Sequence, residues 1–164
     1  SNDPLLSERT NFFWRLEWTY ERKKGGIIMS WQQPKTNWTV TDRFNMDDYN
    51  RILGNLAYLH DKAQELYHVY PVVDMGADKA DYSAYFYADE FNAFESNLDT
   101  INNNIFSQEI GEKQTFFDNG PFIGWEELNR IESASLTVYN ILHRQECVIH
   151  RLSFRLGNMK GVAL

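Results

Sequence analysis

Two histidines and the single cysteine of the chain fall on one face of a predicted helix near the C-terminus. His143, Cys147 and His150 stand at positions i, i+4 and i+7, and neutral imidazole and thiolate groups are ligands that zinc accepts. The rise from i to i+7 is roughly 10 Å along a helix axis, which is too far for all three side chains to hold one ion. We therefore expect no metal here. With no second cysteine, the chain cannot form an internal disulfide.

Other residue types that could do chemistry are present without the spacing that chemistry needs. Asp74, Asp78 and Asp81 lack the spacing of a calcium loop and indicate a solvated acidic loop. His60 and His68 have no Ser or Cys arranged beside them as a nucleophile, and no glycine-rich phosphate loop occurs. The sequence therefore predicts a protein that is not an enzyme, with no catalytic residue and no cofactor.

Charge and composition limit the kinds of partner. The 16 basic and 23 acidic residues give a net charge of -7, which offers no electrostatic attraction to nucleic acid or to anionic lipid. No apolar run approaches the roughly 20 residues that cross a bilayer. A hydrophobic fraction of 43% is enough for the core of one domain.

Three stretches show the apolar spacing of amphipathic helices, and they begin near Asn45, Ala88 and Trp125. In each, apolar residues recur at intervals of three and four positions, which places them on one stripe. An acidic pair opens each helix, where exposed backbone amides favour negative charge. Lys62 is expected beside Asp61 on the solvated face of the first helix. The stripes are Tyr49, Ile52, Leu56, Leu59, Ala63 and Leu66; Phe91, Phe94, Leu98, Ile101 and Ile105; and Leu128, Ile131, Ser135, Val138 and Leu142.

The three predicted helices repeat one pattern around an asparagine. Asn50, Asn92 and Asn129 are separated by 42 and 37 residues, a period typical of a repeated supersecondary unit. The same residue types flank each asparagine: Tyr49, Phe91 and Leu128 before it, Ile52, Phe94 and Ile131 two places after it, and Asp48, Glu90 and Glu127 two places before it. The predicted fold is mainly α, a three-helix repeat bundle with short extended or β segments at the termini and between the helices.

The recurring asparagine has two interpretations. It is either a functional residue used three times, or a structural one that ties the first turn of each helix to the extended segment before it. We favour the second, because an asparagine near a helix start can bond to nearby backbone groups through its side-chain amide.

Extended structure is expected outside the helices. Residues 69–85 indicate a loop with a short extended piece at Val72-Val73. Near the C-terminus, Leu152, Phe154 and Leu156 alternate with polar residues, which predicts a strand that ends at Gly157.

Residues 1–28 form a separate N-terminal region, followed by a helical repeat domain at residues 29–164. In this N-terminal arm, the apolar residues at positions 12, 14, 16, 18 and 20 recur at every second position, as in a half-buried strand. Lys23-Lys24-Gly25-Gly26 can be encoded by a bacterial ribosome-binding site, with Met29 at the distance of a start codon. The arm is thus either a native strand or an in-frame upstream extension.

Five tryptophans are candidates for contact with partners, because an amphipathic ring is suited to a half-buried position. They are Trp14, Trp18, Trp31, Trp38 and Trp125. An aromatic platform that binds sugar is an alternative use of the same rings.

Three stretches resemble a known group of proteins. They are "PKTNWTVTDRFNMDDYNRILGNLAYLHDKA", "YADEFNAFESNLDTI" and "TFFDNGPFIGWEELNRIE". Together they resemble small structural proteins from the tail and baseplate gene region of phages and prophages of Gram-positive bacteria, over roughly residues 31–157. The resemblance implies a virion tail component that is assembled in the bacterial cytoplasm, and it transfers no active-site motif.

The expected function is that of a non-enzymatic structural protein that mediates subunit assembly in a phage tail or baseplate. Its expected partners are other tail or baseplate proteins and further copies of itself, without nucleic acid or membrane. The alternative is a carbohydrate-binding or receptor-binding module of the tail tip.

Overall fold

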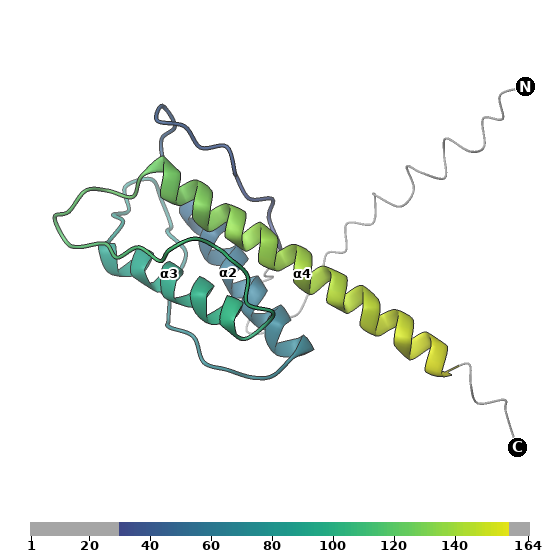
Figure 1. Ribbon diagram of the computed structural model, residues 1–164. Helices are drawn as coiled ribbons and strands as arrows, with labels where there is room; N and C mark the ends of the chain where they lie inside the picture. Colours follow the sequence, from purple (N-terminus) through teal and green to yellow (C-terminus); the bar gives the residue numbers. More distant parts are fainter. Residues whose placement is uncertain (1–29, 158–164) are drawn as a thin grey trace, which may run out of the picture.

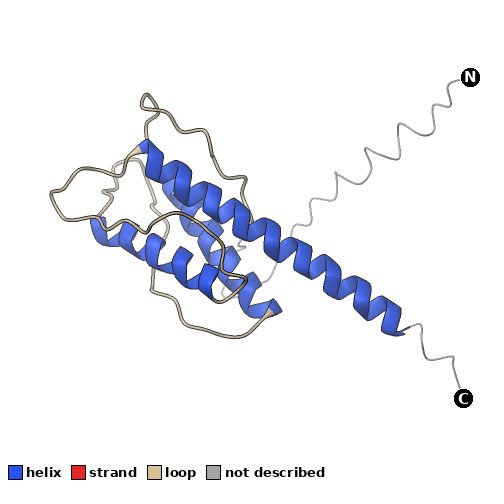
Figure 2. Cartoon of the chain, viewed as in Figure 1, coloured by secondary structure: helices blue, strands red, loops and turns tan. Residues whose placement is uncertain are grey.

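Three helices and their connections make up the part of the chain that the computed structural model describes, residues 30–157, with side chains to residue 149. Helix α2 spans Met46–Leu66, α3 spans Ala88–Asn103 and α4 spans Trp125–Gly157. Within these residues there is no β-strand (Figures 1 and 2). The prediction of a mainly α protein is therefore confirmed.

The start of α2 is fixed by reciprocal hydrogen bonds. The Asn45 side-chain oxygen accepts from the backbone N–H of Asp47 at 2.8 Å and of Asp48 at 3.2 Å, and the Asp48 carboxylate accepts from the Asn45 N–H at 3.1 Å. This is a capping box, in which otherwise unpaired amides of the first turn find acceptors. The predicted N-cap at Asn45 and the predicted starts at Ala88 and Trp125 are confirmed.

The three helices run in the same direction and each contacts the other two. One core cluster joins their N-terminal parts and includes Tyr49, Phe94 and Ile131. A second cluster joins the C-terminal parts of α2 and α3 to the middle of α4 and includes Leu59, Ile101 and Val138. Parallel neighbours need connections that travel back along the helices, and residues 67–87 and 104–124 provide them (Figure 1).

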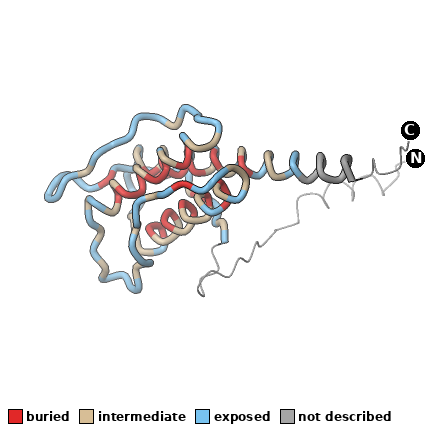
Figure 3. The backbone as a smooth tube through the Cα atoms, turned by 90° about the horizontal axis from the view of Figure 1, so that it is seen from below, coloured by how far each residue is buried: buried red, intermediate tan, exposed pale blue. Residues whose placement is uncertain are grey.

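Buried positions recur at the same distances from Asn50, Asn92 and Asn129. The residue one place before each asparagine and the residues two, six and nine places after it are buried in all three helices. Figure 3 shows this buried side running along the helices, while the connections are mostly exposed. The members of the set are Tyr49, Ile52, Leu56 and Leu59; Phe91, Phe94, Leu98 and Ile101; and Leu128, Ile131, Ser135 and Val138.

The predicted terminal strand is wrong. The segment containing Leu152 and Leu156 belongs to α4, which continues to Gly157, so no terminal strand forms there; alternation over five residues was too short to outweigh the helix that precedes it. The Val72-Val73 segment, expected as a short extended piece of a loop, belongs to no helix or strand, and the Val73 backbone bonds to the Asn97 side chain.

Lys62 does not lie on a solvated face. It is 6% exposed, and its ammonium group contacts the Glu146 carboxylate at 2.6 Å, since α4 passes over this side of α2. The predicted N-terminal arm, residues 1–28, lies outside the described residues.

Replacing Phe94 by alanine tests the shared core. Its ring is fully buried and packs edge-on against Phe91 and at a tilt against Tyr49. We expect the free energy of unfolding to fall by about 3 to 5 kcal/mol, because a large cavity is left. Urea denaturation followed by circular dichroism measures this change. Val40→Ala is the matched control at an 82% exposed position, with an expected change within about 0.5 kcal/mol.

Candidate functional site

The three recurring asparagines each bind the backbone of one residue in a distant segment. The Asn50 amide donates to the Lys79 carbonyl at 3.0 Å and accepts from the Lys79 N–H at 2.8 Å. Asn92 makes the same pair of bonds with Phe116, at 2.9 and 2.8 Å. Asn129 does so with Trp38, at 2.9 and 2.7 Å. We call each such pair of bonds an asparagine clamp.

Three further asparagine clamps were not predicted. Asn55 pairs with Gln32, both bonds being 2.8 Å long. Asn97 pairs with Val73 at the same distances. The third is Asn102, which pairs with Gln108 at 2.9 and 3.0 Å. The sequence signal was available, because Asn55, Asn97 and Asn102 follow Asn50, Asn92 and Asn97 by five residues.

The clamps place three extended segments against the helices. Residues 32–38 are bound by α2 at one end and by α4 at the other. Residues 73–79 are bound by α3 and then by α2. Residues 108–116 are bound at both ends by α3, and Gly111 lies so close to α4 that a Cβ atom would come within 2.7 Å of the Arg130 side chain.

These contacts match the expected kind of bond but not the expected partner. Each asparagine ties a helix to an extended segment through side-chain to backbone hydrogen bonds. The segment is not the one that precedes the same helix: Asn50 and Asn92 hold segments that follow their helices, and Asn129 holds Trp38, 91 residues earlier.

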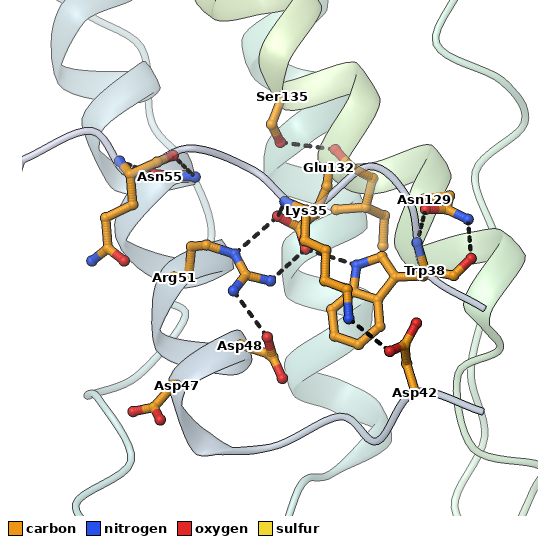
Figure 4. A network of polar contacts seen from close by, with 12 residues as sticks. Lys35, Trp38, Asp42, Asp47, Asp48, Arg51, Asn55, Asn129, Glu132 and Ser135 are labelled. Atoms are coloured by element: carbon orange, nitrogen blue, oxygen red, sulfur yellow. Dashed lines mark hydrogen bonds and ion pairs between the residues drawn. The ribbon is translucent and has the colours of Figure 1, made fainter. Parts of the chain in front are cut away.

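A buried carboxylate joins α4 to α2 beneath residues 32–38 (Figure 4). Glu132, which is 1% exposed, accepts from Arg51 Nη2 at 2.7 Å and Nε at 3.1 Å. It also accepts from the Lys35 N–H at 2.8 Å and from the Trp38 indole N–H at 3.0 Å. Arg51 in turn donates to Asp48 at 2.9 Å. All of the strong acceptor directions of Glu132 are occupied by groups of the chain itself.

A second buried carboxylate joins α3 to α4. Glu95 is 2% exposed and is ion-paired with Arg130, which also donates to Glu127 at 2.7 Å. Burial raises the pKa of Glu95 above its ordinary value, while the Arg130 guanidinium favours the charged form. Both buried carboxylates thus have an arginine partner on the adjacent helix, as buried charges require.

An aromatic cavity of about 480 Å³ opens at the N-terminal end of α3. It is lined by residues 86–88, Phe91 and residues 116–123. Tyr87, Phe117 and Phe122 are each more than half exposed, although large apolar side chains are usually covered. No sequence argument singled out this cavity, because its two walls come from segments 25 or more residues apart that an asparagine clamp at Phe116 brings together.

The predicted interaction aromatics have different environments. Trp38 is 3% exposed and belongs to the core, so it presents no surface to another chain. Trp31 stacks on Tyr139 of α4 with ring centroids 4.2 Å apart. Trp125, at the start of α4, is 40% exposed and remains available for contact. Trp14 and Trp18 lie outside the described residues.

The histidines are not gathered into a site within residues 30–149. His143 Nε2 lies 4.0 Å from Cys147 Sγ, one turn of α4 apart. His60 Nε2 lies 3.0 Å from the Tyr70 carbonyl, and His68 Nε2 lies 3.0 Å from the Asn104 side-chain oxygen. No group of three metal-binding side chains occurs among the described residues. None of the helices there is long and apolar enough to cross a membrane.

Comparisons with protein-family models, with curated proteins and with solved structures find no match to this chain.

Removing an asparagine clamp tests its contribution to stability. We expect Asn97→Ala to lower the free energy of unfolding by about 1 to 3 kcal/mol, because the Val73 N–H and carbonyl lose their partners. Thermal and urea denaturation measure the change. Asn103→Ala on the exposed side of α3 is the matched control, and an equal loss in both variants would contradict a role specific to the clamp.

The buried charge network gives a separate prediction. We expect Glu132→Gln to cost about 3 to 5 kcal/mol, because Arg51 keeps its charge while losing a buried counter-charge. Glu126→Gln, at an exposed position one turn or more away on the same helix, is the control. Unfolding free energies at pH 7 that differ by less than 1 kcal/mol between the two variants would refute this assignment.

Proposed function

We propose that this protein is a non-enzymatic structural protein, built as a three-helix repeat bundle, that works by assembling with other chains. The observation that carries the proposal is the use of the polar side chains. Six asparagines are bonded to the backbone of segments outside the helices, and the buried carboxylates Glu95 and Glu132 are paired with arginines. Groups that could have acted on a substrate are engaged in holding the chain together.

The exposed aromatic residues support an assembly role. Tyr87, Phe117 and Phe122 surround a cavity at one end of the helices instead of being scattered singly. Exposed apolar groups gathered in this way are typical of surfaces that contact another protein.

The proposed setting is a phage tail or baseplate, in a virion assembled in the bacterial cytoplasm. This part rests on the resemblance of residues 31–157 to tail-region proteins. The proposed partners are tail or baseplate proteins together with further copies of this chain.

A second candidate function is binding of a host carbohydrate at the aromatic cavity. It is favoured by the polar side chains of Asp118 and Asn119 among the exposed rings, because sugars are bound by aromatic faces with polar groups beside them. Addition of cell-wall polysaccharide would then change the tryptophan fluorescence through Trp125, and Phe122→Ala would abolish the change.

Deleting the gene tests the proposed function. We expect particles made without this protein to lack a complete tail or baseplate in negative-stain electron microscopy, and a plasmid copy to restore it. Mass spectrometry of purified wild-type particles should detect the protein in a fixed ratio to other tail proteins. Particles that assemble and infect normally without it would contradict a structural role.

A further inference from the structure

The proposed assembly role can be made more specific, and the inference in this section rests on it. We propose that copies of this chain associate in a row, with the part of α4 that follows Glu146 in one copy seated in the aromatic cavity of the next. We call residues 147–157 the α4 extension.

The α4 extension projects beyond the other two helices (Figure 1). Helix α4 has 33 residues, against 21 in α2 and 16 in α3. Near the end of α2, the Lys62 ammonium group forms an ion pair with Glu146 of α4 at 2.6 Å. Helix α4 continues for 11 residues beyond Glu146. Cys147, Val148 and Ile149 at the base of the extension are all exposed.

The amino-acid composition of the α4 extension is typical of a segment that packs against another surface. Its sequence, CVIHRLSFRLG, is mostly apolar, contains two arginines and has no acidic residue. The extension continues a helix that is already formed, so its helical backbone by itself needs no partner. Its apolar residues are stabilised when another surface covers them.

The aromatic cavity has the complementary character. Residues 86–92 and 116–127, which form and border it, contain no lysine, arginine or histidine and carry five carboxylates. Two of these, Glu90 and Glu127, have basic partners within the chain. Asp118, which lines the cavity, and Asp89 and Glu126, which follow lining residues closely in the sequence, are all exposed. The N-terminus of α3 adds partial positive charge locally, but these full negative charges outweigh it.

The charges of the two surfaces determine which surface of one copy can bind which surface of another. Two extensions placed together would bring arginines against arginines, and two cavities would bring carboxylates against carboxylates. An extension and a cavity attract each other instead, and electrostatic complementarity of this kind fixes orientation. Lys79, which lies over the Tyr87 ring and pairs with Glu90, neutralises only one of these carboxylates. A second copy of the chain supplies apolar residues and further positive charge.

The two surfaces lie at opposite ends of parallel helices, so one copy can use both at once. The cavity is at the N-terminal end of α3, and the extension is at the C-terminal end of α4 (Figure 1). Such a contact is heterologous, and it produces a closed ring or an open filament according to the rotation between neighbours.

Two variants that each lose one surface test the proposal. Phe117→Asp alters the cavity at a 73% exposed position, and Val148→Asp alters the extension at a 49% exposed position. We expect each variant alone to remain monomeric at 19.4 kDa in light scattering coupled to gel filtration. An equimolar mixture should form a dimer, because one intact cavity and one intact extension remain. The unmodified protein should form larger species that shrink as salt is raised.

Val40→Asp is the control, because Val40 is 82% exposed and does not line the cavity; it should assemble as the unmodified protein does. Circular dichroism melts of all variants check that they remain folded. A mixture that stays monomeric, or a single variant that still assembles, overturns the contact. An unmodified protein that is monomeric at millimolar concentration but is still incorporated into particles would overturn this inference alone, leaving the structural role intact.

Discussion

The pairing of a side-chain amide with one peptide unit is the interaction on which this structure depends. Three parallel helices cannot be joined by short turns, so long segments must return along them and partly bury their backbone. Buried peptide groups need hydrogen-bond partners, and these segments have no neighbouring strand. Asparagine carries one donor and one acceptor side by side, so it can satisfy both groups of a single residue, as a strand neighbour would. At Trp38, Lys79 and Phe116 it does so with bonds of 2.7 to 3.0 Å.

The buried ion pairs are formed by residues at equivalent positions on different helices, counted from the recurring asparagine. The residue after the asparagine is arginine in α2 and α4 (Arg51 and Arg130), and the residue three places after it is glutamate in α3 and α4 (Glu95 and Glu132). Arg51 pairs with Glu132 and Arg130 with Glu95, so α4 is charge-paired to both other helices. Between α2 and α3 the corresponding positions are Leu53 and Ala93, both buried. At these positions α4 therefore contacts α2 and α3 through ion pairs, whereas the corresponding residues between α2 and α3 are apolar.

Because these polar groups are used inside the chain, the exposed apolar side chains at the two ends of the helices are the candidates for contact with another chain. The asparagines and buried charges are engaged within the chain, whereas Phe117 and Phe122 at one end and Val148 at the other are largely exposed. The acidic pairs that open the helices stabilise the helix starts and also give the cavity end its negative character. One feature of the sequence thus serves both folding and the proposed contact between copies.

The sequence by itself determined where the three helices begin, because each has a capping residue or an acidic first turn and an apolar stripe at local spacing, but it did not predict that α4 continues to Gly157. Asn45, Ala88 and Trp125 mark helix starts on those grounds, and the repeated Asn50, Asn92 and Asn129 were found by alignment alone. Which segment each asparagine holds was decided only by tertiary structure, since Asn129 and Trp38 are 91 residues apart. Tertiary structure also decided that Lys62 is buried and that residues 86–91 and 116–123 form one cavity. The spacing of apolar residues predicts which side of one helix is buried. These contacts depend instead on which surfaces of distant segments pack together, and local spacing does not determine that.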